Sequence, residues 1–245
     1  SGVVTNYPDL CTDGDGGVYV VWEQDNGTTM NVEVLQVHDD GSAGYAATLS
    51  ATSPDSYEQP RIVEDDNGGC HVVYANKTSP NTNQSVSVTS IDNNGNASTV
   101  STDTSQNVTT PLITTDRNGL YWILFKCVDN GSLVLRIGHL GQTAVTTYPV
   151  GVSVVGSYAL SSDLIHGAGT IAEAIIAYPE WGFGMDGQVY LERYKFESNS
   201  LIITLQDALL PYNSQESCDH PTVVPDSIPD GFGYGGAFVA WQTKY

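Results

Sequence analysis

The sequence predicts an all-β fold made of repeated four-stranded units, and three observations support this prediction. A proline-led phrase recurs along the chain of 245 residues. Short β-prone runs alternate with Asp-Gly and Asn-Gly turn signals, as in antiparallel hairpins. No stretch keeps a helical period over three turns. We therefore expect almost no helix.

The repeated phrase sets the organisation of the chain. It reads PDLCTDGDGGVYVVWEQ from residue 8, PRIVEDDNGGCHVVYAN from residue 60 and PLITTDRNGLYWILFKC from residue 111. Pro221 restarts it after a diverged copy that begins near Tyr158. Self-similarity at a fixed period is the sequence signature of a repeat architecture. We therefore predict one domain, residues 1–245, with repeats at 8–59, 60–110, 111–157, 158–220 and 221–245.

An aromatic residue closes the second apolar run of each repeat. One large residue at the same depth in each unit would fill the space between neighbouring units, which favours core packing over a ring of sugar-binding platforms. The series is Trp22, Tyr74, Phe125, Tyr178 and Trp241.

Two further β-prone runs complete four of the five repeats. The fourth runs are AATLS, STVS, VTTY and IITL. Repeats of this length with four strands are typical of the blades of a β-propeller. The sequence therefore predicts a five-bladed β-propeller of four-stranded antiparallel blades. The last blade is incomplete, and we expect a neighbouring copy or flanking sequence to complete it by strand addition at the edge 237–242.

The phrase P-x-I/V/L-x-x-D-x-x-G-G-x-x-V-x-W resembles repeats of extracellular bacterial propellers of the sialidase-like type. That type often carries an Asp-box, Ser-x-Asp-x-Gly-x-Thr-Trp. Residues 12–22 keep the order of acid, glycine and aromatic residue but lack the Thr-Trp ending. The resemblance implies a propeller fold over nearly the whole chain.

Composition excludes several kinds of partner. Eight Lys and Arg against 28 Asp and Glu give a net charge of −20, which repels nucleic acid and anionic lipid. No apolar run of about 18 residues is present, so we expect no membrane insertion. We therefore expect a glycan or protein partner.

Six Asn-x-Ser/Thr sites suit an extracellular or cell-surface glycoprotein, although chance is a rival explanation in a chain rich in these residues. These sites begin at Asn26, Asn76, Asn83, Asn96, Asn107 and Asn130.

The four cysteines form an even set without a C-x-x-C pair, so two disulfides or four buried thiols are the alternatives. Cys11 and Cys218 lie in the first and fifth repeats, which would meet on ring closure. Cys70 and Cys127 lie in adjacent repeats. We predict the pairs Cys11–Cys218 and Cys70–Cys127.

The acidic turn loops are candidate calcium-binding sites. Clustered carboxylates suit hard cations, and Asp13 and Asp15 of the DGDGG loop are the first candidates. The same residue types are also what tight hairpin turns require, and no loop completes an EF-hand pattern. No cofactor is required; calcium is possible.

The diverged fourth repeat carries a Gly-rich loop, YPEWGFGMDGQ. Its aromatic and acidic side chains could stack on a sugar and bond its hydroxyls, or fold back on the blade. The candidate ligand-binding residues are Glu180, Trp181, Phe183 and Asp186.

An enzymatic interpretation is the alternative. A sialidase-like site would need clustered arginines, and the chain has only Arg61, Arg117, Arg136 and Arg193. Five-bladed glycosidases use channel carboxylates as acid and base, for which Asp9, Glu58, Asp163 and Asp219 are candidates. We predict a non-catalytic binding or assembly module, such as an adhesin or filament subunit, with no catalytic residue assigned. The alternatives are a secreted glycoside hydrolase and a purely structural spacer.

Overall fold

The computed structural model is all-β in the parts of the chain that it describes. These are residues 5–51, 55–65, 67–78, 83–103, 107–116, 119–139, 146–150, 157–162, 172–180, 188–197, 200–209, 217–225 and 237–244. Strands β1 to β18 occur there and no helix does. No helix in these ranges could therefore cross a bilayer.

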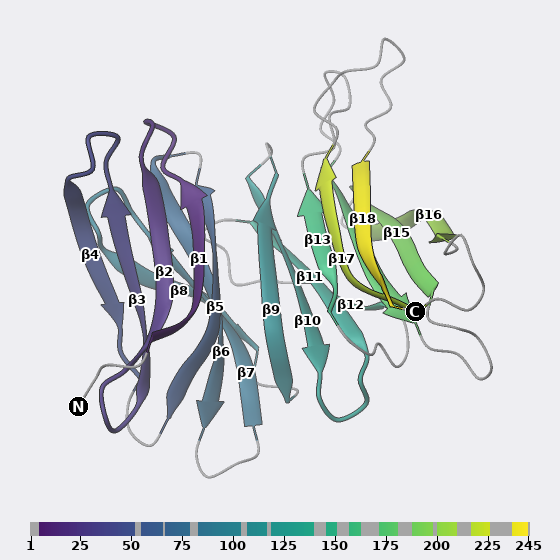
Figure 1. Cartoon of the computed structure of the whole chain (residues 1–245), viewed down its shortest axis with the longest axis horizontal. Coiled ribbons are helices and arrows are strands. Elements are labelled where there is room, and N and C mark those ends of the chain that lie inside the picture. Colours follow the sequence, from purple (N-terminus) through teal and green to yellow (C-terminus); the bar gives the residue numbers. More distant parts are fainter. Residues whose placement is uncertain are drawn as a thin grey trace.

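The strands form five antiparallel sheets, which are the predicted blades (Figure 1). Blade 1 contains β1 (Thr5–Thr12), β2 (Val18–Asp25), β3 (Met30–Val37) and β4 (Ala43–Leu49). Blade 2 contains β5 (Ser56–Asp65), β6 (Gly69–Thr78), β7 (Asn83–Ile91) and β8 (Ala97–Asp103). Blade 3 contains β9 (Val108–Thr115), β10 (Leu120–Cys127), β11 (Leu133–His139) and β12 (Thr146–Val150).

The last two blades follow the same order but differ in size. Blade 4 contains β13 (Ala159–Ser162), β14 (Ala172–Glu180), β15 (Gln188–Glu197) and β16 (Ser200–Leu209). Blade 5 contains β17 (Ser217–Pro225) and β18 (Ala237–Lys244). It is two-stranded within the described residues, which confirms the prediction of an incomplete last blade. How its edge is completed stays a prediction.

The first strand of each blade lies on the inside of the fold. β1 contacts β5, β5 contacts β9, and β13 contacts both β9 and β17. The fourth strands, β4, β8, β12 and β16, are the opposite edges of the four-stranded sheets. Figure 1 shows blade 1 at one end of this series and β17 and β18 toward the other. The first strands therefore form the inner edges of the sheets.

The hydrophobic core lies between neighbouring blades. Tyr74 packs with residues of blade 1, Phe125 with residues of blade 2, and Tyr178 with residues of blade 3. These three members of the aromatic series are buried, as predicted. Trp22 and Trp241 are only partly buried. Trp22 alternates with the buried Tyr19 and Val21 along β2, so it faces away from blade 2.

Aspartates of the repeat fix the hairpins between first and second strands. Asp116 is buried, and its Oδ1 accepts the Leu120 N–H while its Oδ2 accepts Trp122 Nε1–H. In blade 2, Asp65 Oδ1 accepts the Asn67 N–H. A carboxylate that bonds back to its own backbone is common turn chemistry. This explains why the repeat keeps an aspartate at this position.

Neither predicted disulfide is formed. Cys11 and Cys70 are free thiols, which excludes both the Cys11–Cys218 and the Cys70–Cys127 pair in this structure. Cys11 and Cys70 instead pack in the core between blades 1 and 2, where burial raises the pKa of the Cys70 thiol to about 12. The prediction relied on chain position within the repeats, which does not fix the direction of a side chain.

Candidate functional site

The residue before each repeat proline has an unusual backbone conformation. Tyr7, Gln59, Thr110 and His220 are the non-glycine residues with positive φ among those described, with values of 49°, 53°, 54° and 51°. Each precedes the proline of its repeat, and the strand pairing shifts register at each of these points. The inner strands β1, β5, β9 and β17 thus carry the same bulge at the same level.

This conformation is costly and must be held by its surroundings. Residues before proline prefer an extended backbone, and a non-glycine residue in the left-handed region costs about 1–3 kcal/mol. Bulges of this kind re-aim side chains and are common next to active sites. Four aligned bulges on inner strands therefore mark one end of the channel as the candidate site.

Hydrogen bonds between blades hold the bulges at Gln59 and Thr110, and we call these hydrogen bonds the bulge latches. The Gln59 N–H donates to Glu23 Oε1 of blade 1 at a distance of 2.5 Å. Gln59 Oε1 accepts the Thr110 N–H of blade 3 at 2.5 Å and Thr109 Oγ1–H at 2.9 Å. Tyr158 of blade 4 donates its hydroxyl to Thr110 O at 2.5 Å. The bulges of blades 2 and 3 are thus each tied to a neighbouring blade.

Glu23 is the buried carboxyl of this region, with 3% of its surface exposed. Burial raises its pKa and nearby Glu58 raises it further, while the Gln59 N–H and the Asn6 side chain lower it; the balance is a raised pKa. Glu58 is partly exposed, and its Oε1 lies 3.4 Å from Lys77 Nζ. Two carboxyl groups in different environments therefore flank the bulge of blade 2.

We expect Glu23→Gln to stabilise the protein at pH 7 but not at pH 4. Because its pKa is raised in the folded state, the stability that Glu23 contributes is present below its unfolded pKa, about 4.3. That contribution is lost as the pH rises through the folded pKa. Glutamine keeps the acceptor for the Gln59 N–H without a charge. We therefore expect a higher Tm than wild type at pH 7 and an unchanged Tm at pH 4. Thermal unfolding at both pH values checks this, and an equal change at pH 4 and pH 7 would contradict it.

The structure gives the predicted channel carboxylates different roles. Asp9 Oδ2 accepts the Ile62 N–H at 3.1 Å, which links blades 1 and 2. Glu58 lies two residues before its proline on β5, and Asp219 has the equivalent position on β17. Asp163 lies outside the described residues. The structure thus gives Glu58 and Asp219 the same repeat position on two inner strands.

The structure describes only the two ends of the predicted ligand loop. Glu180 ends β14, where it pairs with Gln188. Trp181, Phe183 and Asp186 lie outside the described residues. Their role in ligand binding stays a prediction.

The predicted calcium loop is organised by Asp13. This residue is buried, and its Oδ1 accepts the N–H groups of Asp15 at 3.0 Å and Gly17 at 2.8 Å. Its Oδ2 accepts Gln36 Nε2–H at 3.2 Å. Burial raises the pKa of Asp13, but these hydrogen bonds outweigh it and the pKa is lowered. Asp15 is exposed. No group of three or more potential metal ligands lies in the described parts of the chain, and calcium binding stays a prediction.

Three of the predicted glycosylation sites lie on exposed turns, namely Asn26, Asn96 and Asn130. At two of them the hydroxyl of the sequon donates to the asparagine Oδ1, from Thr28 at 2.9 Å and from Ser132 at 2.7 Å. Asn76 and Asn107 are partly buried, and Asn83 begins β7. Glycosylation at all six sites stays a prediction.

Comparison with solved structures confirms the β-propeller fold. The chain matches the Hadza microbial sialidase Hz136 with a TM-score of 0.61 and 8% identity, over 90% of this chain and 48% of the sialidase. It matches the exo-β-1,3-galactanase 1,3Gal43A of Clostridium thermocellum with a TM-score of 0.54 and 11% identity, over 98% of this chain and 60% of the galactanase. Its match to the polysaccharide lyase Uly1 has a TM-score of 0.52 and 11% identity, over 97% of this chain and 58% of the lyase.

The chain thus spans about half to three fifths of the length of these structures. No protein-family model and no curated protein matches its sequence. The fold is a β-propeller.

These matches correct the functional interpretation of the sequence. We predicted a non-catalytic binding or assembly module, but the three solved structures are a sialidase, a galactanase and a polysaccharide lyase by name. The alternative, a glycoside hydrolase that uses channel carboxylates, fits them better. The prediction was wrong because it relied on the absence of a family motif, which a diverged catalytic propeller need not retain.

Proposed function

We propose that this chain is the propeller of an enzyme that cleaves glycans, with its site at the bulge end of the inner strands. The observation that carries this proposal is the set of four left-handed bulges at one level of β1, β5, β9 and β17. Bulges of this kind re-aim neighbouring side chains, and the residues beside them include Glu58 and Asp219, the type of polar group that a site for a polyhydroxylated substrate requires. The carbohydrate-cleaving enzymes that share the fold support this class of reaction.

Glu58 is the proposed catalytic acid or base. It lies on an inner strand next to the bulge residue Gln59, and its side chain is 26% exposed, so a substrate can reach it. Glycosidases need two carboxyl groups across the scissile bond. Asp219, at the equivalent position of blade 5, is the proposed second carboxyl group. Glu23 is buried behind the bulge and is a positioning residue that holds Gln59.

The substrate of this site is proposed to be a neutral glycan. Recognition of an acidic sugar relies on arginine, and this chain of net charge −20 contains eight Lys and Arg in total. Arg193 is already engaged by Glu173 in blade 4. Nothing in the described part of the channel thus offers an arginine cluster for a carboxylate.

The localisation of the protein and the origin of its Asp13 hairpin are part of the same proposal. An extracellular or cell-surface localisation is proposed as well, and the sequons on exposed turns support it. The Asp13 hairpin, with its buried carboxylate, is proposed to be a diverged counterpart of an Asp-box turn.

Hydrolysis of neutral oligosaccharides, measured as release of reducing sugar, tests this function. We expect the wild-type protein to cleave at least one galactan, arabinan or related neutral glycan. Glu58→Gln should lower kcat/KM by about 10²–10⁴, the usual contribution of general acid–base catalysis. Thermal unfolding should show that the variant folds.

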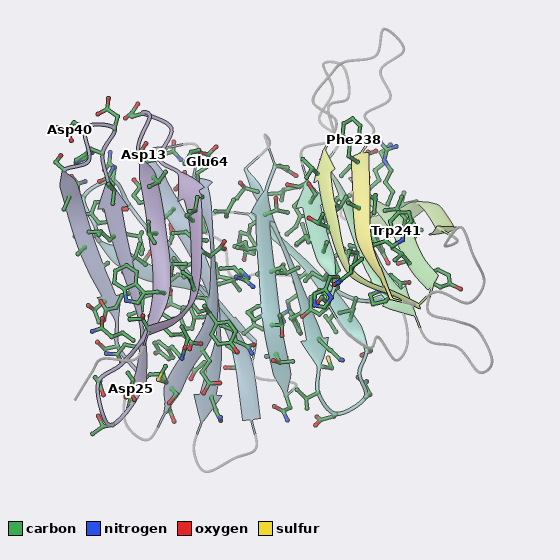
Figure 2. All side chains as sticks on the ribbon, viewed as in Figure 1. Asp13, Asp25, Asp40, Glu64, Phe238 and Trp241 are labelled. Carbon is green, nitrogen blue, oxygen red and sulfur yellow. The ribbon has the colours of Figure 1, made fainter. Side chains whose placement is uncertain are left out.

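Glu64→Gln is the matched control, because Glu64 lies on the same strand at its opposite end (Figure 2). We expect its kcat/KM to stay within about threefold of wild type, since surface changes away from the site have small effects. Absence of cleavage across the glycan panel, or a Glu58→Gln variant as active as Glu64→Gln, would reject the proposal.

A further inference from the structure

A cavity opens between blades 1 and 2. Its volume is about 230 Å³. Its walls come from the end of the outer strand β4 and from all four strands of blade 2. Tyr57 and Glu58 are successive residues of β5, so their side chains point to opposite faces of the sheet. The cavity therefore lies on the face of blade 2 opposite to the one toward which the Glu58 side chain points.

Two tyrosine rings form one wall of this cavity. The ring centroids of Tyr57 and Tyr74 lie 4.6 Å apart, with the ring planes tilted by 38°. Tyr74 is almost fully buried, whereas Tyr57 is only partly buried. Tyr74 thus supports the Tyr57 ring from behind. A supported, partly exposed aromatic ring is a rigid surface for the apolar face of a ligand.

Hydroxyl groups form the rest of the polar lining. The Tyr74 hydroxyl lies 3.1 Å from Thr89 Oγ1, and Thr89 Oγ1 lies 3.5 Å from Thr99 Oγ1. Thr48 and Ser50 add two more hydroxyls from blade 1, and Thr48 Oγ1–H donates to Glu33 Oε2 at 2.6 Å. The two other lining residues are aliphatic. Donors and acceptors are present without any charged lining residue.

This chemistry matches a neutral sugar. A pyranose has one apolar face and a rim of hydroxyls, which suit an aromatic wall and a set of hydroxyl groups. An anionic ligand would meet no cation here and would be repelled by the net charge of −20. The volume is below the roughly 300–1,000 Å³ of sites for drug-sized ligands. It therefore suits a single sugar ring.

We propose that the cavity between blades 1 and 2 is a secondary binding site for one neutral pyranose unit of a glycan. It anchors the glycan on the flank of the propeller and takes no part in bond cleavage. This proposal stands independently of the catalytic proposal, because it concerns binding at another face of blade 2.

Titration with monosaccharides tests the site by isothermal calorimetry and ligand-observed NMR. We expect galactose, glucose or mannose to bind with a Kd on the order of 1 mM, as the usual binding energy per atom gives for a ligand of about twelve non-hydrogen atoms. Galacturonic acid should bind at least about tenfold more weakly, because no lining residue can neutralise its carboxylate. Measuring in the Glu58→Gln background excludes turnover.

Two variants locate the binding in the cavity. Tyr57→Ala removes the aromatic wall and should weaken neutral-sugar binding by about tenfold or more. Thr99→Val keeps the shape of an exposed side chain but removes its hydroxyl, and should weaken binding by about threefold. Thr99→Val keeps the test valid if Tyr57→Ala does not fold.

Tyr190→Ala is the matched control, because Tyr190 also stacks on a buried tyrosine, Tyr178, in another blade with centroids 5.9 Å apart. Its sugar affinity should equal that of wild type. Undetectable binding of all three hexoses would overturn the proposal. Equal affinity in Thr99→Val, or tighter binding of galacturonic acid than of the hexoses, would do the same. Loss of cleavage in Glu58→Gln with sugar binding retained would separate this site from the catalytic one.

Discussion

Phe125→Ala is expected to lower the free energy of unfolding by about 3–5 kcal/mol, the usual cost of truncating a buried phenylalanine. Phe125 has no exposed surface and packs in the core between blades 2 and 3. The substitution removes apolar contacts and leaves a cavity between two sheets that backbone hydrogen bonds hold in place. The cost is therefore expected near the upper end of the range for core substitutions.

Phe238→Ala is the control for this prediction. Phe238 is 66% exposed on β18 of the incomplete blade (Figure 2), so the same substitution should change stability by no more than about 0.5 kcal/mol. Urea unfolding of both variants, analysed with a common m-value, measures the difference. Equal losses in the two variants would contradict the assignment of the core.

Asp116→Ala is expected to lower the free energy of unfolding by about 2–4 kcal/mol. The buried carboxylate of Asp116 accepts the Leu120 N–H at 3.2 Å and Trp122 Nε1–H at 3.0 Å. Alanine leaves both donors inside the protein without this acceptor, at a cost of about 1–3 kcal/mol for each buried group. The loss also disturbs Trp122, which is fully buried.

The matched control is Asp92→Ala in blade 2. Asp92 accepts the N–H groups of Asn94 and Asn96 in a similar turn, but it is exposed. Water can satisfy those donors, so we expect a clearly smaller loss than for Asp116→Ala. Urea unfolding that ranks Asp92→Ala as the more damaging variant would show that burial does not set the importance of these turns.

The repeat phrase was enough to predict the blades, because proline, aspartate, glycine and the closing aromatic recur at fixed spacing. Each of these residues has one local structural reason for its position. The aspartate closes a hairpin, as Asp116 does, and the aromatic fills the space between blades, as Phe125 does. Local and periodic signals of this kind can be read from one chain.

The candidate site could not be predicted in the same way. The prolines aligned the repeats, but the left-handed conformation of Gln59 depends on acceptors and donors from neighbouring blades. Glu23, which lies 36 residues from Gln59 in sequence, carries no motif that links the two. The repeated proline was the available signal, since it marks one position of each inner strand, but proline alone favours an extended predecessor. Cysteine pairing failed for a similar reason, because it depends on side-chain direction.

Because of the bulge latches, hydrogen exchange at single amides can distinguish two motions of the propeller. The N–H groups of Gln59 and Thr110 donate to acceptors on a different blade, Glu23 for the first and Gln59 for the second. Fraying within one sheet leaves these two hydrogen bonds in place, whereas separation of two blades breaks them. Hydrogen exchange at these amides therefore reports the parting of neighbouring blades, and exchange at the ladder amides of the same strands reports the opening of a single sheet.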